Sequence, residues 1–210
     1  MPQKQAKKVD RRTLYTVNTI KDALLELLER TTFDKISVAS VCRQAEITRT
    51  TFYLHFPNLT AVLNEVLHDA MQVSENALLP EELACGLPHA EERGQAAEKM
   101  QEPCDALLPM CQRIADSAKY RAVFLDETLS GYIIKIIYQH EKDKVIPSLM
   151  QRGGLSRSDA EMLFRFMLYG SFAVNKELGW EKNEKWYAFQ TLLLRFTREG
   201  MGQLRTREQV

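Results

Sequence analysis

Residues 37–56, SVASVCRQAEITRTTFYLHF, decide how this chain folds. Ser37 precedes one short run of apolar residues and Thr48 precedes a second. A hydroxyl side chain in that position caps a helix by accepting a hydrogen bond from an amide of its first turn. The pattern predicts two short helices, over residues 38–44 and 49–55, with a link of only three residues before the second cap. Such a pair is typical of a helix-turn-helix.

The second of these helices is rich in hydrogen-bonding side chains. Phe52 and Phe56 are spaced i, i+4 and are expected to anchor it, which leaves Arg49, Thr50 and Tyr53 facing outward. Arginine hydrogen-bonds guanine, a threonine methyl contacts a thymine methyl, and other polar groups bind phosphates. The residues predicted to contact DNA are Ser37, Thr48, Arg49, Thr50, Thr51, Tyr53, His55 and, from the N-terminal arm, Lys7, Lys8 and Arg11. The alternative is an ordinary surface helix with a polar face.

Charge is unevenly distributed in this neutral chain. Residues 1–56 contain ten Lys and Arg against six Asp and Glu, a net charge of +4, so residues 57–210 carry −4. A basic N-terminal quarter favours a polyanionic partner. A basic arm that is merely solvated would show the same excess.

Apolar residues at helical spacing predict helices along the rest of the chain, and no strand is expected. The expected helices cover about residues 12–30, 59–79, 103–117, 119–127, 129–151, 157–178 and 184–204, with a mobile loop over the Gly- and Pro-containing residues 80–103. The expected fold is all-α. Residues 1–57 form an arm and a three-helix helix-turn-helix DNA-binding domain, and residues 58–210 form a helical ligand-binding and dimerisation domain.

The stretch SVASVCRQAEITRTTFYLHFPNLTAVL, residues 37–63, resembles the DNA-binding signature of the tetracycline-repressor (TetR) family of transcriptional regulators. The resemblance extends over about residues 12–65 and joins cap, apolar and aromatic positions in order. It implies a homodimer that binds a near-palindromic double-stranded DNA operator, in most members a repressor released by a small-molecule effector in the C-terminal domain. Family residues that match Arg49, Thr50, Thr51, Tyr53 and His55 lie at or near DNA.

Two positions depart from the family pattern. The family usually has glycine in the turn, where this chain has Glu46, and lysine at the start of the next helix, where it has Leu59. An acid near phosphates and a missing lysine predict weaker non-specific DNA binding or a different operator. They also support an alternative, a partner-dependent co-activator or regulator of the same fold with weak or no independent DNA binding.

The last two helices are apolar on more than one side, which predicts that they bury a second surface. A four-helix bundle formed with a second copy would provide it. The alternative is that these residues fill the core of one chain. The residues predicted at the dimer interface are Phe166, Phe172, Trp186, Phe189, Leu193 and Phe196.

Bulky residues of the middle helices are candidates to line an effector pocket. The alternative is that they pack in the core. The predicted pocket residues are Met110, Phe124, Tyr132, Ile136, Phe166 and Tyr169.

The sequence lacks GxSxG, HExxH and a phosphate-binding Gly-rich loop, so no catalytic residue is predicted and the chain is not expected to be an enzyme. The four cysteines have no CxxC spacing, and no metal or cofactor is expected. No apolar run approaches the roughly 18 residues that span a bilayer, and residues 1–12 lack the apolar segment of a secretory signal. A cytoplasmic protein without a membrane partner is expected.

Overall fold

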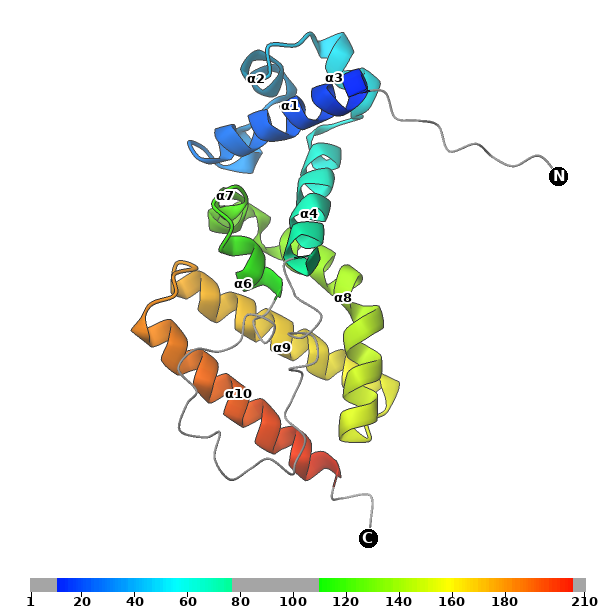
Figure 1. Cartoon of the computed structure of the whole chain (residues 1–210), viewed down its shortest axis with the longest axis vertical. Coiled ribbons are helices and arrows are strands. Elements are labelled where there is room, and N and C mark those ends of the chain that lie inside the picture. The colour runs from blue at the N-terminus through cyan, green and yellow to red at the C-terminus, as the bar shows by residue number, and fades with distance from the viewer. Residues whose placement is uncertain (1–10, 77–109, 206–210) are drawn as a thin grey trace, which may run out of the picture. The chain divides into compact units, whose positions relative to one another are not determined.

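The computed structural model describes residues 11–76 and 110–205, and every regular element within those two ranges is helical (Figure 1). The all-α fold predicted from the sequence is therefore confirmed for the described residues. The chain divides into two compact units, Met1–Asp69 and Ala70–Val210. The loop predicted over residues 80–103 and the arm residues Lys7 and Lys8 lie outside the described residues.

The first unit is built from four α-helices around one apolar core. It contains α1 (Arg11–Leu28), the 3-10 helix η1 (Phe33–Lys35), α2 (Val38–Gln44), α3 (Arg49–His55) and the first part of α4 (Leu59–Asn76). Every α-helix contributes a side chain that is no more than 1% exposed. These residues are Ile20, Leu24, Val41, Phe52, Val62, Leu63 and Val66. The two short helices thus depend on burial of their inward faces, because seven residues are too few for a stable isolated helix.

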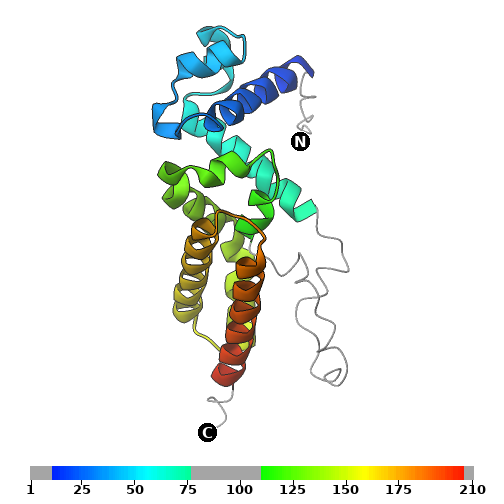
Figure 2. The ribbon, with the colours of Figure 1, turned by 90° about the vertical axis from the view of Figure 1, so that its left-hand side faces the viewer.

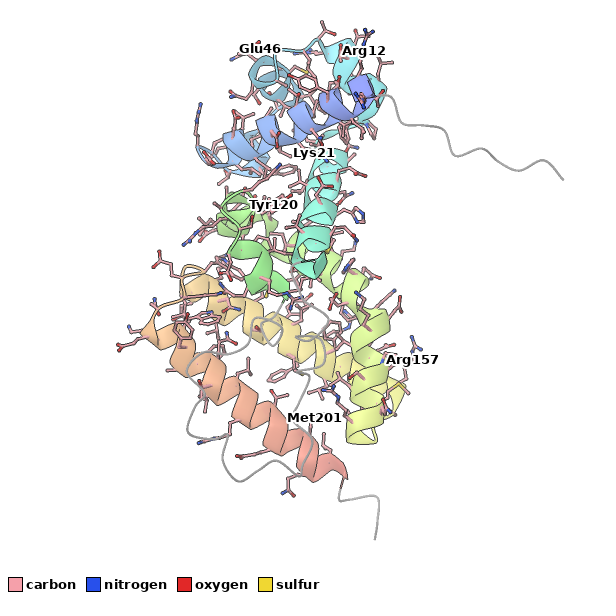
Figure 3. The ribbon with its side chains drawn as sticks, viewed as in Figure 1. Arg12, Lys21, Glu46, Tyr120, Arg157 and Met201 are labelled. Atoms are coloured by element: carbon pink, nitrogen blue, oxygen red, sulfur yellow. The ribbon has the colours of Figure 1, made fainter. Side chains whose placement is uncertain are left out.

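The first unit ends at Asp69, whereas the sequence predicts a boundary after residue 57. The first part of α4 buries Val62, Leu63 and Val66. Lys21 Nζ on α1 lies 2.5 Å from Asp69 Oδ2 on α4, and the Lys21 side chain is only 10% exposed. This partly buried ion pair ties α4 to α1 (Lys21 is labelled in Figure 3), so the boundary falls after the first part of α4.

The second unit begins in α4 and contains two short α-helices followed by three long ones. After Asn76 the described elements are α6 (Met110–Ala115), α7 (Arg121–Leu125), the 3-10 helix η3 (Glu127–Leu129), α8 (Ser130–Gly153), α9 (Arg157–Glu177) and α10 (Glu184–Arg205). Ser156 Oγ accepts a hydrogen bond from Asp159 N at 3.1 Å, and Asn183 Oδ1 accepts one from Trp186 N at 3.1 Å. Each of these bonds caps the helix that follows. Figure 1 and Figure 2 show α9 and α10 side by side.

Aromatic packing fills the core of the second unit beside α9. The Trp180 ring meets Phe172 and Phe124 edge to face, with centroids 4.9 and 5.2 Å apart. Trp180 Nε1 donates to the Phe124 carbonyl at 3.2 Å. Phe124 is fully buried and Met110 is 6% exposed. These two side chains, predicted to line an effector pocket, lie in the buried core of the second unit.

A buried polar cluster joins α6, α9 and α10. Trp186 Nε1 donates to Asn175 Oδ1 at 2.8 Å and to Gln112 Oε1 at 3.1 Å, and all three residues are fully buried. Because a buried polar group without a partner is costly, these bonds favour one relative placement of the three helices. Trp186 and the 2%-exposed Phe172 therefore belong to the core of one chain, which corrects their prediction as interface residues.

Candidate nucleic-acid interface

Helix α2 starts with a reciprocal pair of serine hydrogen bonds. Ser37 Oγ accepts from Ser40 N at 3.1 Å, and Ser40 Oγ accepts from Ser37 N at 3.0 Å. This capping box satisfies two amides that the helix leaves unpaired. Ile36 and Val41, which the sequence places at the two positions of a hydrophobic staple, are 7% and 0% exposed. The cap and the burial of these side chains fix the direction in which α2 leads into the turn.

The turn between α2 and α3 is a Schellman motif. Ile47 N donates to the Cys42 carbonyl at 2.9 Å, and Glu46 N donates to the Arg43 carbonyl at 3.3 Å. The motif requires a left-handed backbone at Glu46, whose φ is 53°. Glycine is the usual residue at this position because a Cβ atom costs roughly 1–2 kcal/mol there. Glu46 is exposed in this turn (Figure 3).

Helix α3 is capped by the threonine that the sequence predicts. Thr48 Oγ1 accepts from Thr51 N at 3.1 Å, and the two threonine hydroxyl oxygens lie 2.9 Å apart. The hydroxyl–hydroxyl bond uses one of the two hydroxyl hydrogens. The other hydrogen remains available to an acceptor such as a phosphate oxygen.

Phe52 and Phe56 hold α3 by its inward face. They are 0% and 5% exposed, and their ring centroids are 6.1 Å apart. Arg49, Thr50 and Tyr53 are exposed, with Tyr53 at 55%. The structure therefore has the predicted orientation, in which the hydrogen-bonding side chains of α3 face outward.

The other predicted contact residues lie in several places. Arg11 is the exposed first residue of α1, and Ser37 is exposed while its hydroxyl caps α2. His55 is half-buried and lines a hollow of about 370 Å³. The other residues of that hollow are Val17, Phe56, Pro57, Ala61 and Glu65. His55 thus faces α1 and α4 more than it shares the outward face of α3.

Arg49 also acts electrostatically on α2. Burial raises the pKa of the Cys42 thiol, and the positive charge of Arg49 opposes that shift. The thiol stays protonated at neutral pH, so it is a small core side chain and not a nucleophile.

Leu54 is a feature of α3 that the sequence analysis missed. Its side chain is 76% exposed, the highest value among the large hydrophobic residues of the described ranges. The signal was present in the sequence, because a residue two positions after the anchor Phe52 points to the opposite side of a helix. The prediction considered only polar side chains and passed over it.

A second surface feature is an apolar groove of about 420 Å³ between α9 and α10. Phe166 and Phe196 line it and are 69% and 67% exposed. Four of the six predicted interface residues line the groove, namely Phe166, Phe189, Leu193 and Phe196. Of the six predicted pocket residues only Phe166 does; Tyr132 and Ile136 are half-buried on α8 and Tyr169 is 52% exposed. The predicted pocket set is therefore not brought together around this groove.

Two residues of the groove are glycines, although no close contact within the chain requires glycine there. Gly170 and Gly200 line it from α9 and α10, and a Cβ atom added to either would meet no atom within 4 Å. Glycine inside a helix costs about 0.5–1 kcal/mol relative to alanine. These positions leave room for something outside the chain to approach the helix backbones.

The described residues carry no feature of two other kinds of site. They hold no group of three or more His, Cys, Asp and Glu side chains arranged for a metal ion. None of their helices has the length and apolarity needed to cross a membrane.

Comparison with known proteins adds no relative to this description. The chain matches no protein-family model and no curated protein.

The left-handed backbone at Glu46 generates a testable prediction. Replacing Glu46 with glycine should raise the free energy of unfolding by up to about 1 kcal/mol, because relief of the Cβ strain exceeds the added freedom of glycine in the unfolded chain. Urea unfolding followed by circular dichroism measures the change. Glu46→Ala is the matched control, since it removes the same charge and keeps the Cβ atom. Equal stability of the two variants would contradict the account of the turn.

Proposed function

We propose that this protein is a dimeric, sequence-specific DNA-binding transcriptional regulator whose α3 enters the major groove. The observation that carries the proposal is the outward face of α3, where Arg49, Thr50 and Tyr53 stand exposed on a helix fixed by its cap and its two buried phenylalanines. By the family resemblance, the regulator is a repressor that a small-molecule effector releases.

The proposed contacts follow from the chemistry of these side chains. Arg49 donates two hydrogen bonds to guanine, and Thr50 contacts a base edge through its hydroxyl or its methyl group. Thr48 and Tyr53 hydrogen-bond phosphates and fix the register of the helix on the duplex. Arg11, at the start of α1, adds a phosphate contact. Neutralised phosphates release counterions, so binding should weaken as salt rises.

A dimer follows from the groove between α9 and α10 together with the symmetry of operators. Two copies related by a twofold axis present the same patch to each other. This patch combines exposed rings, Phe166 and Phe196, with a hollow floored by Gly170 and Gly200. Because the exposed rings and the hollow lie on the same face, the rings of one copy fit the hollow of another. We therefore propose a second copy as the partner. Such a dimer carries two α3 helices, as a near-palindromic site requires.

Glu46 favours a second candidate function. It is exposed in the turn that leads into α3, and it is the only acid among residues 37–56. Its charge repels phosphates. A regulator that acts through a protein partner, with weak or no independent DNA binding, would tolerate this residue.

Selection of bound duplexes from random DNA at two salt concentrations tests the proposal. The purified wild-type protein should enrich a near-palindromic motif and bind it less tightly at the higher salt. Enrichment of no motif at either concentration would reject DNA binding and leave the partner-dependent regulator.

Arg49→Ala should weaken binding to the selected duplex by about 1–3 kcal/mol and relax the preference for one base in each half-site, because a bidentate contact to guanine is lost. Fluorescence anisotropy against duplexes with single base changes measures both effects. Arg157→Ala is the control, because it removes one positive charge from an arginine whose side chain is 70% exposed in the second unit. If Arg49→Ala kept the wild-type affinity and base preference, the proposal that Arg49 contacts a base would be rejected.

Gly200→Glu should raise the dissociation constant of the dimer at least tenfold, because it places a charge in an apolar groove that a second copy covers. Gly202→Glu is the matched control on the same helix. Gly202 is exposed, an added Cβ there meets no atom within 4 Å, and it does not line the groove. Sedimentation equilibrium measures both constants. A wild-type monomer at micromolar concentration, or equal effects of the two substitutions, would reject this dimer surface.

A further inference from the structure

The most exposed large hydrophobic side chain in the described ranges lies on α3, the proposed recognition helix. Leu54 is 76% exposed on α3, while the neighbouring Phe52 is fully buried. Fold stability does not explain Leu54, because its side chain removes little apolar surface from water. A partner that offers an apolar contact among polar ones does explain it.

Helix geometry pairs Leu54 with Thr50. Each residue of an α-helix turns by about 100°, so Leu54 lies about 160° around the axis from Phe52. Thr50 is four residues earlier, is exposed, and lies next to Leu54 on the same face. The leucine side chain and the threonine methyl group together form a small apolar strip on the outward face.

The surroundings of this strip decide between a protein and a duplex as its partner. Helix α3 has seven residues, which is too short for the i, i+3, i+4 and i+7 anchors of a helix that docks in a protein groove. Arg49 and Tyr53 are exposed on the same helix. An isolated apolar strip beside hydrogen-bonding groups fits a surface that is polar except for single methyl groups.

We infer that Leu54, together with Thr50, reads the C5-methyl group of a thymine in each operator half-site. The thymine methyl is the apolar group that base edges present in the major groove. Leucine has no donor or acceptor, so its preference comes from contact with that methyl and distinguishes thymine from cytosine, which lacks it. This inference rests on the proposed DNA binding and adds a base to the expected operator.

The position of that thymine relative to the base read by Arg49 follows from helix dimensions. Five residues of α-helix rise about 7.5 Å, and base pairs are stacked about 3.4 Å apart. The thymine should therefore lie on the order of two base pairs from the guanine that Arg49 contacts.

Single replacement of thymine by uracil in the selected duplex tests the inference, because it removes only the methyl group and leaves the protein unchanged. The wild-type protein should lose about three- to fivefold in affinity at one position of each half-site, the size expected for one buried methyl group. Leu54→Ala should bind the thymine duplex more weakly by a similar factor and should respond less than the wild type to uracil at that position, because only the Thr50 methyl remains to contact the thymine. Leu125→Ala, which truncates a leucine that is 52% exposed on α7, should behave as wild type.

Two results would overturn the inference and they are distinguishable. A wild-type protein that binds no duplex rejects the proposed function and this inference with it. If the wild-type protein binds its operator but keeps its affinity with uracil at every thymine, the inference alone is rejected. The same holds if uracil lowers the affinity of the wild type and of Leu54→Ala by the same factor. Circular dichroism of Leu54→Ala confirms that the helices are intact, as expected for an exposed side chain.

Discussion

Burial of Phe52 is the interaction on which the rest of this unit depends. The ring is fully buried, and it fixes which face of a seven-residue helix points outward. The caps at Ser37 and Thr48 set where α2 and α3 begin, and the left-handed Glu46 sets the angle between them. Only with α3 pinned in this way do Arg49, Thr50, Tyr53 and Leu54 form a surface with a fixed order of chemical groups.

Local features of this structure were readable from the sequence. The bounds of α2 and α3 agree with prediction, because a cap and the burial of apolar residues at helical spacing are encoded within a few residues. Residues 133–138 include four β-branched isoleucines, yet they are helical within α8, as the helix predicted over about residues 129–151 requires. The positive φ at Glu46 agrees with what the family resemblance implies, because a glycine usually stands at this place in that family.

The sequence did not show which apolar side chains are buried within the chain and which are exposed. Phe172 and Trp186 looked like Phe166 and Phe196 in the sequence, yet the first two are buried and the last two protrude. The difference depends on tertiary contacts, such as the hydrogen bonds of Trp186 to Gln112 and Asn175 across 74 and 11 residues of chain. Spacing within one helix contains no information about those distant partners, so it could not separate the buried rings from the protruding ones.

Our proposal is that α3 meets DNA through its outward face. Hydroxyl-radical footprinting of the protein, alone and bound to a selected duplex, tests it directly by mass spectrometry. We expect Tyr53 and Leu54, which are 55% and 76% exposed, to be oxidised in the protein alone and protected in the complex, while Leu125 is oxidised equally in both. Unchanged oxidation of Tyr53 and Leu54 in a saturated complex would contradict the claim and would place the DNA on another surface.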